Sequence, residues 1–132
     1  MANGSDIGKL ILRVTLGILI LLHGISKIIG GPGPIMSMVA KIGMPPALGY
    51  LVYVGEVLAP VLLIVGVWTR LAAAIVAINM IVAIWLAHKS QLFSLASTGG
   101  WALELQGMFL MTAIALVFLG AGRYALGSGR LN

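Results

Sequence analysis

Ionisable side chains interrupt the long apolar stretches of this sequence, and that position needs an explanation. If the stretches cross a bilayer, a charged side chain in the hydrocarbon costs roughly 2.5–3.5 kcal/mol on insertion scales, so each one requires a partner or a function. Together with one tyrosine, these side chains are the candidates for ligand binding or proton transfer: Arg13, His23, Lys27, Tyr53, Glu56, His88 and Glu104. Their types alone assign no catalytic role.

The depths of these residues place most of them in the same half of the membrane. At about 1.5 Å per helical residue, His23 lies about 9 Å, Glu56 about 13 Å and Glu104 about 4 Å from one end of the expected bundle. Lys27 and His88 lie at that surface too. We therefore expect polar groups from all the helices to meet in one half of the bilayer.

Helical periodicity suggests which of these groups are partners. Tyr53 and Glu56 share a helical face, so the phenol is expected to hydrogen-bond the carboxylate. Arg13 enters from the opposite face of the membrane, and Glu56 is expected to pair with Arg13 or His23. Such a pair either only holds the helices together or forms part of a ligand or proton site. Asn79 is interpreted as a link between helices.

The sequence gives little support for metal or thiol chemistry. Two histidines are too few and too poorly placed for a bis-histidine haem site. A metal held by His23, His88, Glu56 and Glu104 is a minor alternative, so we predict no metal site. Cysteine is absent, which excludes disulfides, thiolate metal sites and thiol redox chemistry carried by this chain itself.

The elements that must position these residues are transmembrane helices. The chain has 132 residues, of which 61% are hydrophobic and 8% charged, whereas soluble domains are about one quarter charged. A helix needs roughly 20 residues to cross about 30 Å of hydrocarbon. We predict an all-α integral membrane protein, a four-helix up-and-down bundle in a single transmembrane domain (1–132), with spans at 9–29, 47–67, 71–88 and 101–119.

The two long connections, 30–46 and 89–100, are predicted to lie on the same side of the membrane. The first contains several apolar residues and forms either a short amphipathic helix on the membrane surface or a mobile loop. Lys and Arg number five on the side of the termini, Lys9, Arg13, Arg70, Arg123 and Arg130, against three on the loop side, Lys27, Lys41 and Lys89. This excess favours cytoplasmic termini.

The net charge of +5 raises the question of nucleic acid binding. The basic residues, however, stand mostly at the ends of apolar runs, where they meet lipid headgroups and fix orientation. The predicted partner is therefore the lipid bilayer, and we expect no nucleic acid.

Four segments in order carry a resemblance to a known family: LRVTLGILILLHGISK, YVGEVLAPVLLIVGVWTR, AIWLAHK and GAGRYALG. They resemble the DoxX family, and the resemblance covers nearly the whole chain. It implies a four-helix protein of the prokaryotic inner membrane, related to the small subunit of thiosulfate:quinone oxidoreductase. The positions that match by motif are Arg13, His23, Gly24, Lys27, Glu56, Arg70, His88, Gly122, Arg123 and Tyr124. The resemblance does not give their chemical roles.

Three functions are compatible with this sequence. The first is an oxidoreductase-associated subunit that binds a quinone or another lipophilic molecule in an intramembrane polar pocket. It is not expected to catalyse redox chemistry alone, because no cofactor site is evident within the chain and a redox-enzyme subunit would have to supply the electrons. The alternatives are a non-catalytic assembly partner and a small proton-coupled carrier, which as a four-helix protein would need to form a homo-oligomer.

Overall fold

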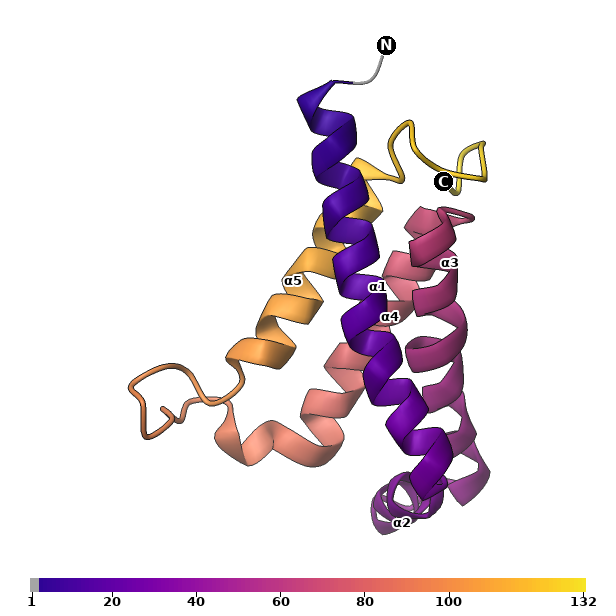
Figure 1. Cartoon of the computed structure of the whole chain (residues 1–132). Coiled ribbons are helices and arrows are strands. Elements are labelled where there is room, and N and C mark those ends of the chain that lie inside the picture. Colours follow the sequence, from indigo (N-terminus) through magenta and orange to yellow (C-terminus); the bar gives the residue numbers. More distant parts are fainter. Residues whose placement is uncertain (1–2) are drawn as a thin grey trace.

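The computed structural model of the protein describes residues 3–132, and every regular element among them is helical (Figure 1). The elements are α1 (Gly4–Gly30), α2 (Gly33–Lys41), η1 (Pro46–Leu51), η2 (Val54–Leu58), α3 (Ala59–Val65), α4 (Thr69–Ala83), η3 (Ile84–His88), η4 (Lys89–Gln91) and α5 (Glu104–Leu119). Both termini lie at one end of the bundle, and α2 lies at the other end.

Helix α1 begins at Gly4 rather than at the predicted residue 9, because a capping box starts it. The Asn3 side chain accepts a hydrogen bond from the Asp6 N–H at 3.0 Å, and the Asp6 carboxylate accepts one from the Asn3 N–H at 3.4 Å. These bonds satisfy N–H groups that have no partner within the helix. The helix ends at Gly30, and Gly31 follows with a φ of +81°.

The second span is continuous from Pro46 to Val65 but is not one regular α-helix. It starts as the 3₁₀-helix η1, passes through the π-helix η2 and continues as α3. Pro60 explains the irregular middle, because a proline has no N–H to bond the carbonyl four residues earlier. That carbonyl belongs to Glu56, and the preceding Ala59 N–H bonds the Val54 carbonyl instead.

The third span runs from Thr69 to Gln91 through α4, the π-helix η3 and the 3₁₀-helix η4. Helix α5 begins at Glu104, whereas the predicted span began at residue 101. Trp101 instead forms an antiparallel bridge with Leu95 that closes the preceding loop. As a result α5 is about 24 Å long, shorter than the hydrocarbon thickness.

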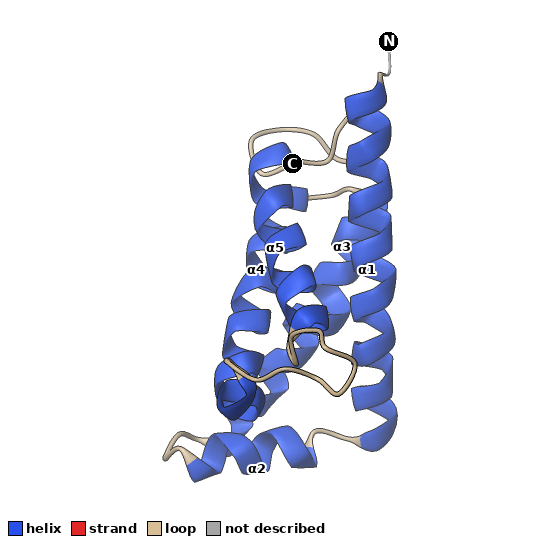
Figure 2. Ribbon diagram, turned by 90° about the vertical axis from the view of Figure 1, so that its left-hand side faces the viewer, coloured by secondary structure: helices blue, strands red, loops and turns tan. Residues whose placement is uncertain are grey.

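The helices pack as two neighbouring pairs, α1 on α3 and α4 on α5, and these pairs enclose one apolar core. Leu16, Ile20, Leu63, Val76 and Leu116 are almost fully buried there. In the orthogonal view α2 runs across the end of the bundle (Figure 2), so the loop between the first two spans forms a helix rather than a simple loop.

Large apolar side chains cover the outside of the bundle as well, among them Leu22, Ile78 and Phe118. Three of the helical spans are long and apolar enough to cross a membrane, and α5 is a shorter apolar helix. An outer surface of this kind is stable only against lipid. The protein is an all-α integral membrane bundle, as predicted.

Candidate functional site

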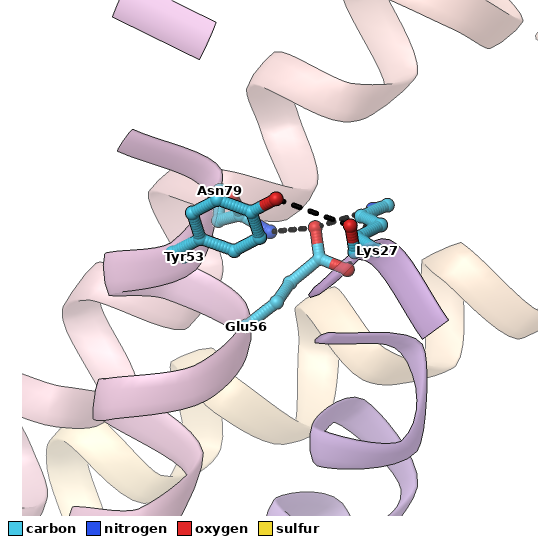
Figure 3. Close-up of polar contacts among 4 residues, drawn as sticks. All are labelled: Lys27, Tyr53, Glu56 and Asn79. Carbon is cyan, nitrogen blue, oxygen red and sulfur yellow. Dashed lines mark hydrogen bonds and ion pairs between the residues drawn. The ribbon is translucent and has the colours of Figure 1, made fainter. Parts of the chain in front are cut away.

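An ion pair between Lys27 and Glu56 lies at the centre of the candidate site (Figure 3). The Lys27 Nζ donates to both carboxylate oxygens of Glu56, at 2.6 and 2.7 Å. The Asn79 side-chain amide of α4 adds a third bond to Oε2 at 3.1 Å. The Glu56 side chain is only 3% exposed, and that of Lys27 is 32% exposed. The pair therefore neutralises a buried acid and joins three helices through it.

The local sequence explains why Glu56 reaches this position. It lies in the π-helix η2, and π-helical turns of this kind are frequent at functional sites. The Glu56 carbonyl is left without the helical bond that Pro60 cannot make, and α1 approaches it at Gly24. A Cβ atom on Gly24 would overlap that carbonyl and would lie 2.9 Å from the Val57 side chain. Glycine is therefore required where the two helices meet.

Tyr53 does not hydrogen-bond Glu56, so this expectation is wrong. Its hydroxyl donates instead to the backbone carbonyl of Lys27, at 3.1 Å. Two facts account for the difference. Both Glu56 oxygens already accept bonds from Lys27, and Oε2 accepts a further one from Asn79. The Lys27 carbonyl lies in the last turn of α1, where carbonyls lack a partner within the helix.

Four of the predicted site residues line one small cavity of about 110 Å³ inside the bundle: His23, Lys27, Glu56 and His88. The remaining lining residues are Ile20, Met80, Ala83, Leu105, Gln106 and Phe109. The cavity therefore combines ionisable groups from three spans with apolar walls and one amide from α5. We call it the polar cavity.

The two histidines occupy different positions around the polar cavity. His23 meets Phe109 of α5 edge to face, with ring centroids 5.9 Å apart, and is exposed on its outer side. No hydrogen bond joins the His23 ring to another residue among 3–132. His88 is half-buried and has Gln91 within hydrogen-bond distance, with Nδ1 and Oε1 2.9 Å apart. His23 is thus the histidine whose ring nitrogens are free to bind a ligand.

Arg13 lies outside the polar cavity, and Lys27 rather than Arg13 or His23 pairs with Glu56. The Arg13 guanidinium is fully buried at the other end of the bundle. It donates to the carbonyls of Leu63 at 3.0 Å and Ile64 at 3.1 Å, and also to that of Tyr124. These are carbonyls at the end of α3 and in the C-terminal tail. Arg13 therefore caps a helix C-terminus, which suits a cation.

Glu104 also lies outside the polar cavity. It is exposed in the first turn of α5 and lines a separate recess. The residues of α5 that line the polar cavity, Leu105, Gln106 and Phe109, lie on a different face of the helix.

Gln106 was missed by sequence reasoning, although a polar amide inside the predicted span 101–119 was an available signal. The bond from Asn79 to Glu56 supplies the partner for the link between helices that the sequence predicts. Within residues 3–132, no three His, Asp or Glu side chains are grouped so that they could hold a metal ion.

Comparison with known proteins shows which family the chain belongs to. The chain is 32% identical to "Putative oxidoreductase CatD" of Bacillus subtilis over 126 residues, which is 96% of this chain and 89% of the relative. It is also 32% identical to an uncharacterized protein of Haemophilus influenzae over 118 residues, 87% of this chain and 84% of the relative. No solved structure shows a significant match.

The sequence profile of the DoxX family matches residues 8–89. This region contains both partners of the ion pair and the two histidines of the polar cavity, whereas α5 lies beyond it. The match confirms the resemblance found in the sequence motifs, and the chain belongs to the DoxX family.

Proposed function

We propose that this protein is an oxidoreductase-associated membrane subunit that binds the polar headgroup of a lipophilic molecule, a quinone in particular, in the polar cavity. The observation that carries the proposal is the convergence of His23, Lys27, Glu56 and His88 on one cavity within an otherwise apolar bundle. The oxidoreductase association is supported by the name of the Bacillus subtilis relative.

The groups around the cavity suit a neutral ligand with hydrogen-bond acceptors. Lys27 and Glu56 neutralise each other, so the pair offers little net charge to an anion. His23 and the Gln106 amide are the polar groups left for a ligand, because among residues 3–132 neither has a side-chain hydrogen bond. A quinone carbonyl accepts such bonds, and an imidazole can deliver a proton when the carbonyl is reduced.

The size of the cavity fits a headgroup rather than a whole lipophilic molecule. Its volume of about 110 Å³ is below the roughly 300–1,000 Å³ of pockets that enclose drug-sized ligands. His23 of α1 and Leu105 of α5 line the cavity and are also exposed on the bundle surface. A headgroup would therefore enter between α1 and α5, and its isoprenoid tail would stay in the lipid.

This role requires a protein partner. Reduction of a quinone to a quinol takes up two electrons and two protons, and the side chains of this chain supply no electron carrier. In this proposal the partner delivers the electrons and this subunit holds the headgroup and provides a proton path. We further propose that the subunit resides in the prokaryotic inner membrane.

Ligand binding can be tested by difference spectroscopy with short-tailed ubiquinone and menaquinone analogues on protein in mild detergent. We expect His23→Ala and Glu56→Gln to weaken binding at least tenfold, the loss of about 1.4 kcal/mol of binding free energy. Lys27→Gln, which leaves Glu56 without its cation, is expected to weaken binding as well. Lys41→Gln is the matched control, since it removes one exposed cation at the same end of the bundle.

Equal binding by wild type and all three cavity variants would contradict the proposal. If instead the variants change only the recovery of other proteins with this one from membranes, the polar network serves assembly. That result would favour the non-catalytic partner function.

A further inference from the structure

A second recess, of about 530 Å³, lies between α4 with η3 on one side and α5 on the other. Ile81 and Ile84 form one wall, Met108 and Met111 form the other, and Trp101 and Glu104 lie at the loop end. It shares no lining residue with the polar cavity. We call it the apolar groove, and it is a site separate from the polar cavity.

Two glycines shape the loop end of the apolar groove. A Cβ on Gly107 would lie 2.5 Å from the Trp101 ring, so glycine lets the indole rest directly on α5. The indole N–H donates to the Leu92 carbonyl at 2.8 Å, which fixes the ring and leaves its apolar part to line the groove. Similarly, a Cβ on Gly100 would lie 2.7 Å from a Glu104 carboxylate oxygen, so the carboxylate sits against bare backbone.

The charge of the apolar groove is carried by one acid. Glu104 is the single ionisable residue in its lining, and no residue among 3–132 donates a side-chain hydrogen bond or an ion pair to it. Carboxylates next to hydrocarbon are costly unless a cation or water meets them. The apolar groove is thus about 10 Å long from Glu104 to Met111, and it has a negative group at one end.

We propose that the apolar groove binds one acyl chain of a phospholipid whose headgroup carries a primary ammonium, the phosphatidylethanolamine class, with that ammonium at Glu104. The chain lies along Ile81, Met108 and Met111. A primary ammonium donates charge-assisted hydrogen bonds to a carboxylate. The quaternary ammonium of a choline headgroup has no N–H to donate, so Glu104 distinguishes the two lipids.

Quenching of Trp101 by brominated lipids tests this proposal. Trp68→Phe and Trp85→Phe are introduced first, so that Trp101 is the one tryptophan left in the chain. The protein is placed in phosphatidylcholine vesicles that contain the same small fraction of either phosphatidylethanolamine or phosphatidylcholine with bromines at mid-chain. We expect the ethanolamine lipid to bind about fivefold more tightly, as judged by quenching, because the net contribution of one hydrogen bond is of this size.

Glu104→Gln keeps the size of the side chain and is expected to abolish the preference while an acyl chain still quenches Trp101. Asp6→Asn is the matched control: it removes one acid at the opposite end of the bundle and should leave the preference unchanged. The proposal is overturned if both lipids quench Trp101 equally in the protein that retains Glu104, because such a result means that only annular lipid is present. It is also overturned if the preference for the ethanolamine lipid survives in Glu104→Gln. Finally, it is overturned if neither lipid quenches Trp101, as would happen if a second copy of the chain covered the groove.

Discussion

Lys27 and Glu56 illustrate how a buried charge is tolerated in this protein. The acid is almost completely enclosed, while the lysine keeps about a third of its side chain exposed. The long apolar stem of the lysine therefore allows its ammonium group to reach the buried carboxylate from the surface. Removing one partner leaves the other without compensation, and such a loss costs more than the pair contributes as a whole.

A double-mutant cycle on this pair measures that asymmetry. We expect Lys27→Gln to lower the free energy of unfolding by about 2 kcal/mol, because it leaves the Glu56 carboxylate buried beside Asn79 alone. Adding Glu56→Gln should cost less than it does in the wild type, with a coupling free energy of about 1 kcal/mol. Unfolding in mixed micelles with a rising fraction of sodium dodecyl sulfate gives the four stabilities. Strictly additive losses would mean that the two side chains do not interact.

The sequence was sufficient to predict that polar groups from several spans meet near one end of the bundle, because position along a helix follows from the rise per residue. It was not sufficient to predict the partners. Lys27, one helical turn beyond His23, reaches Glu56, whereas Arg13 and His23 were the expected partners. Side-chain reach and the spacing between helices decide such a choice, and neither can be obtained from the periodicity of a single helix.

Among the helices, the contact between α1 and the second span depends on Gly24. The carbonyl that this glycine faces belongs to Glu56 itself, within the π-helix η2. The same contact therefore packs the two helices together and holds Glu56 in its position. The π-helical turn that precedes Pro60 was not predicted from the sequence.

Gly24→Ala tests that contact. The added methyl group would overlap the Glu56 carbonyl, so we expect the free energy of unfolding to fall by about 2 kcal/mol, within the range for overpacked sites. Gly8→Ala is the control, since it lies in the same helix and its Cβ meets no atom within 4 Å. That control should raise stability by about 0.5–1 kcal/mol through helix propensity alone. Thermal unfolding in detergent compares the two, and similar effects at both positions would rule out the close approach.

The molecule as a whole was the most predictable part. Composition and the length of the apolar runs were enough to predict an all-α membrane bundle, since a helix of about 20 apolar residues satisfies its own backbone hydrogen bonds in lipid. The ends of the helices were less predictable. The start of α5 at Glu104 depends on the Leu95–Trp101 bridge, which is a contact within the loop rather than a property of the apolar run.

The orientation of the bundle remains a prediction, with both termini in the cytoplasm. The chain lacks cysteine, so single cysteines can be added and labelled with a membrane-impermeant maleimide. We expect Ser97→Cys, in the long loop before α5, to react in intact cells. Ser128→Cys, in the C-terminal tail, should react only after the membrane is opened. The reverse pattern would place the termini outside and show that five basic residues against three do not set the topology.

The pairing of polar groups between α1 and the second span also bears on how the protein is made. Lys27 bonds Glu56, and Arg13 bonds the carbonyls of Leu63 and Ile64, so two of the three lysine and arginine side chains of α1 have partners by residue 64. A ribosome has therefore produced a helical hairpin in which Glu56 already has its cation before α4 is synthesised. Such a hairpin can leave the translocation channel as one unit during biogenesis, with the buried acid of the second span already paired to Lys27.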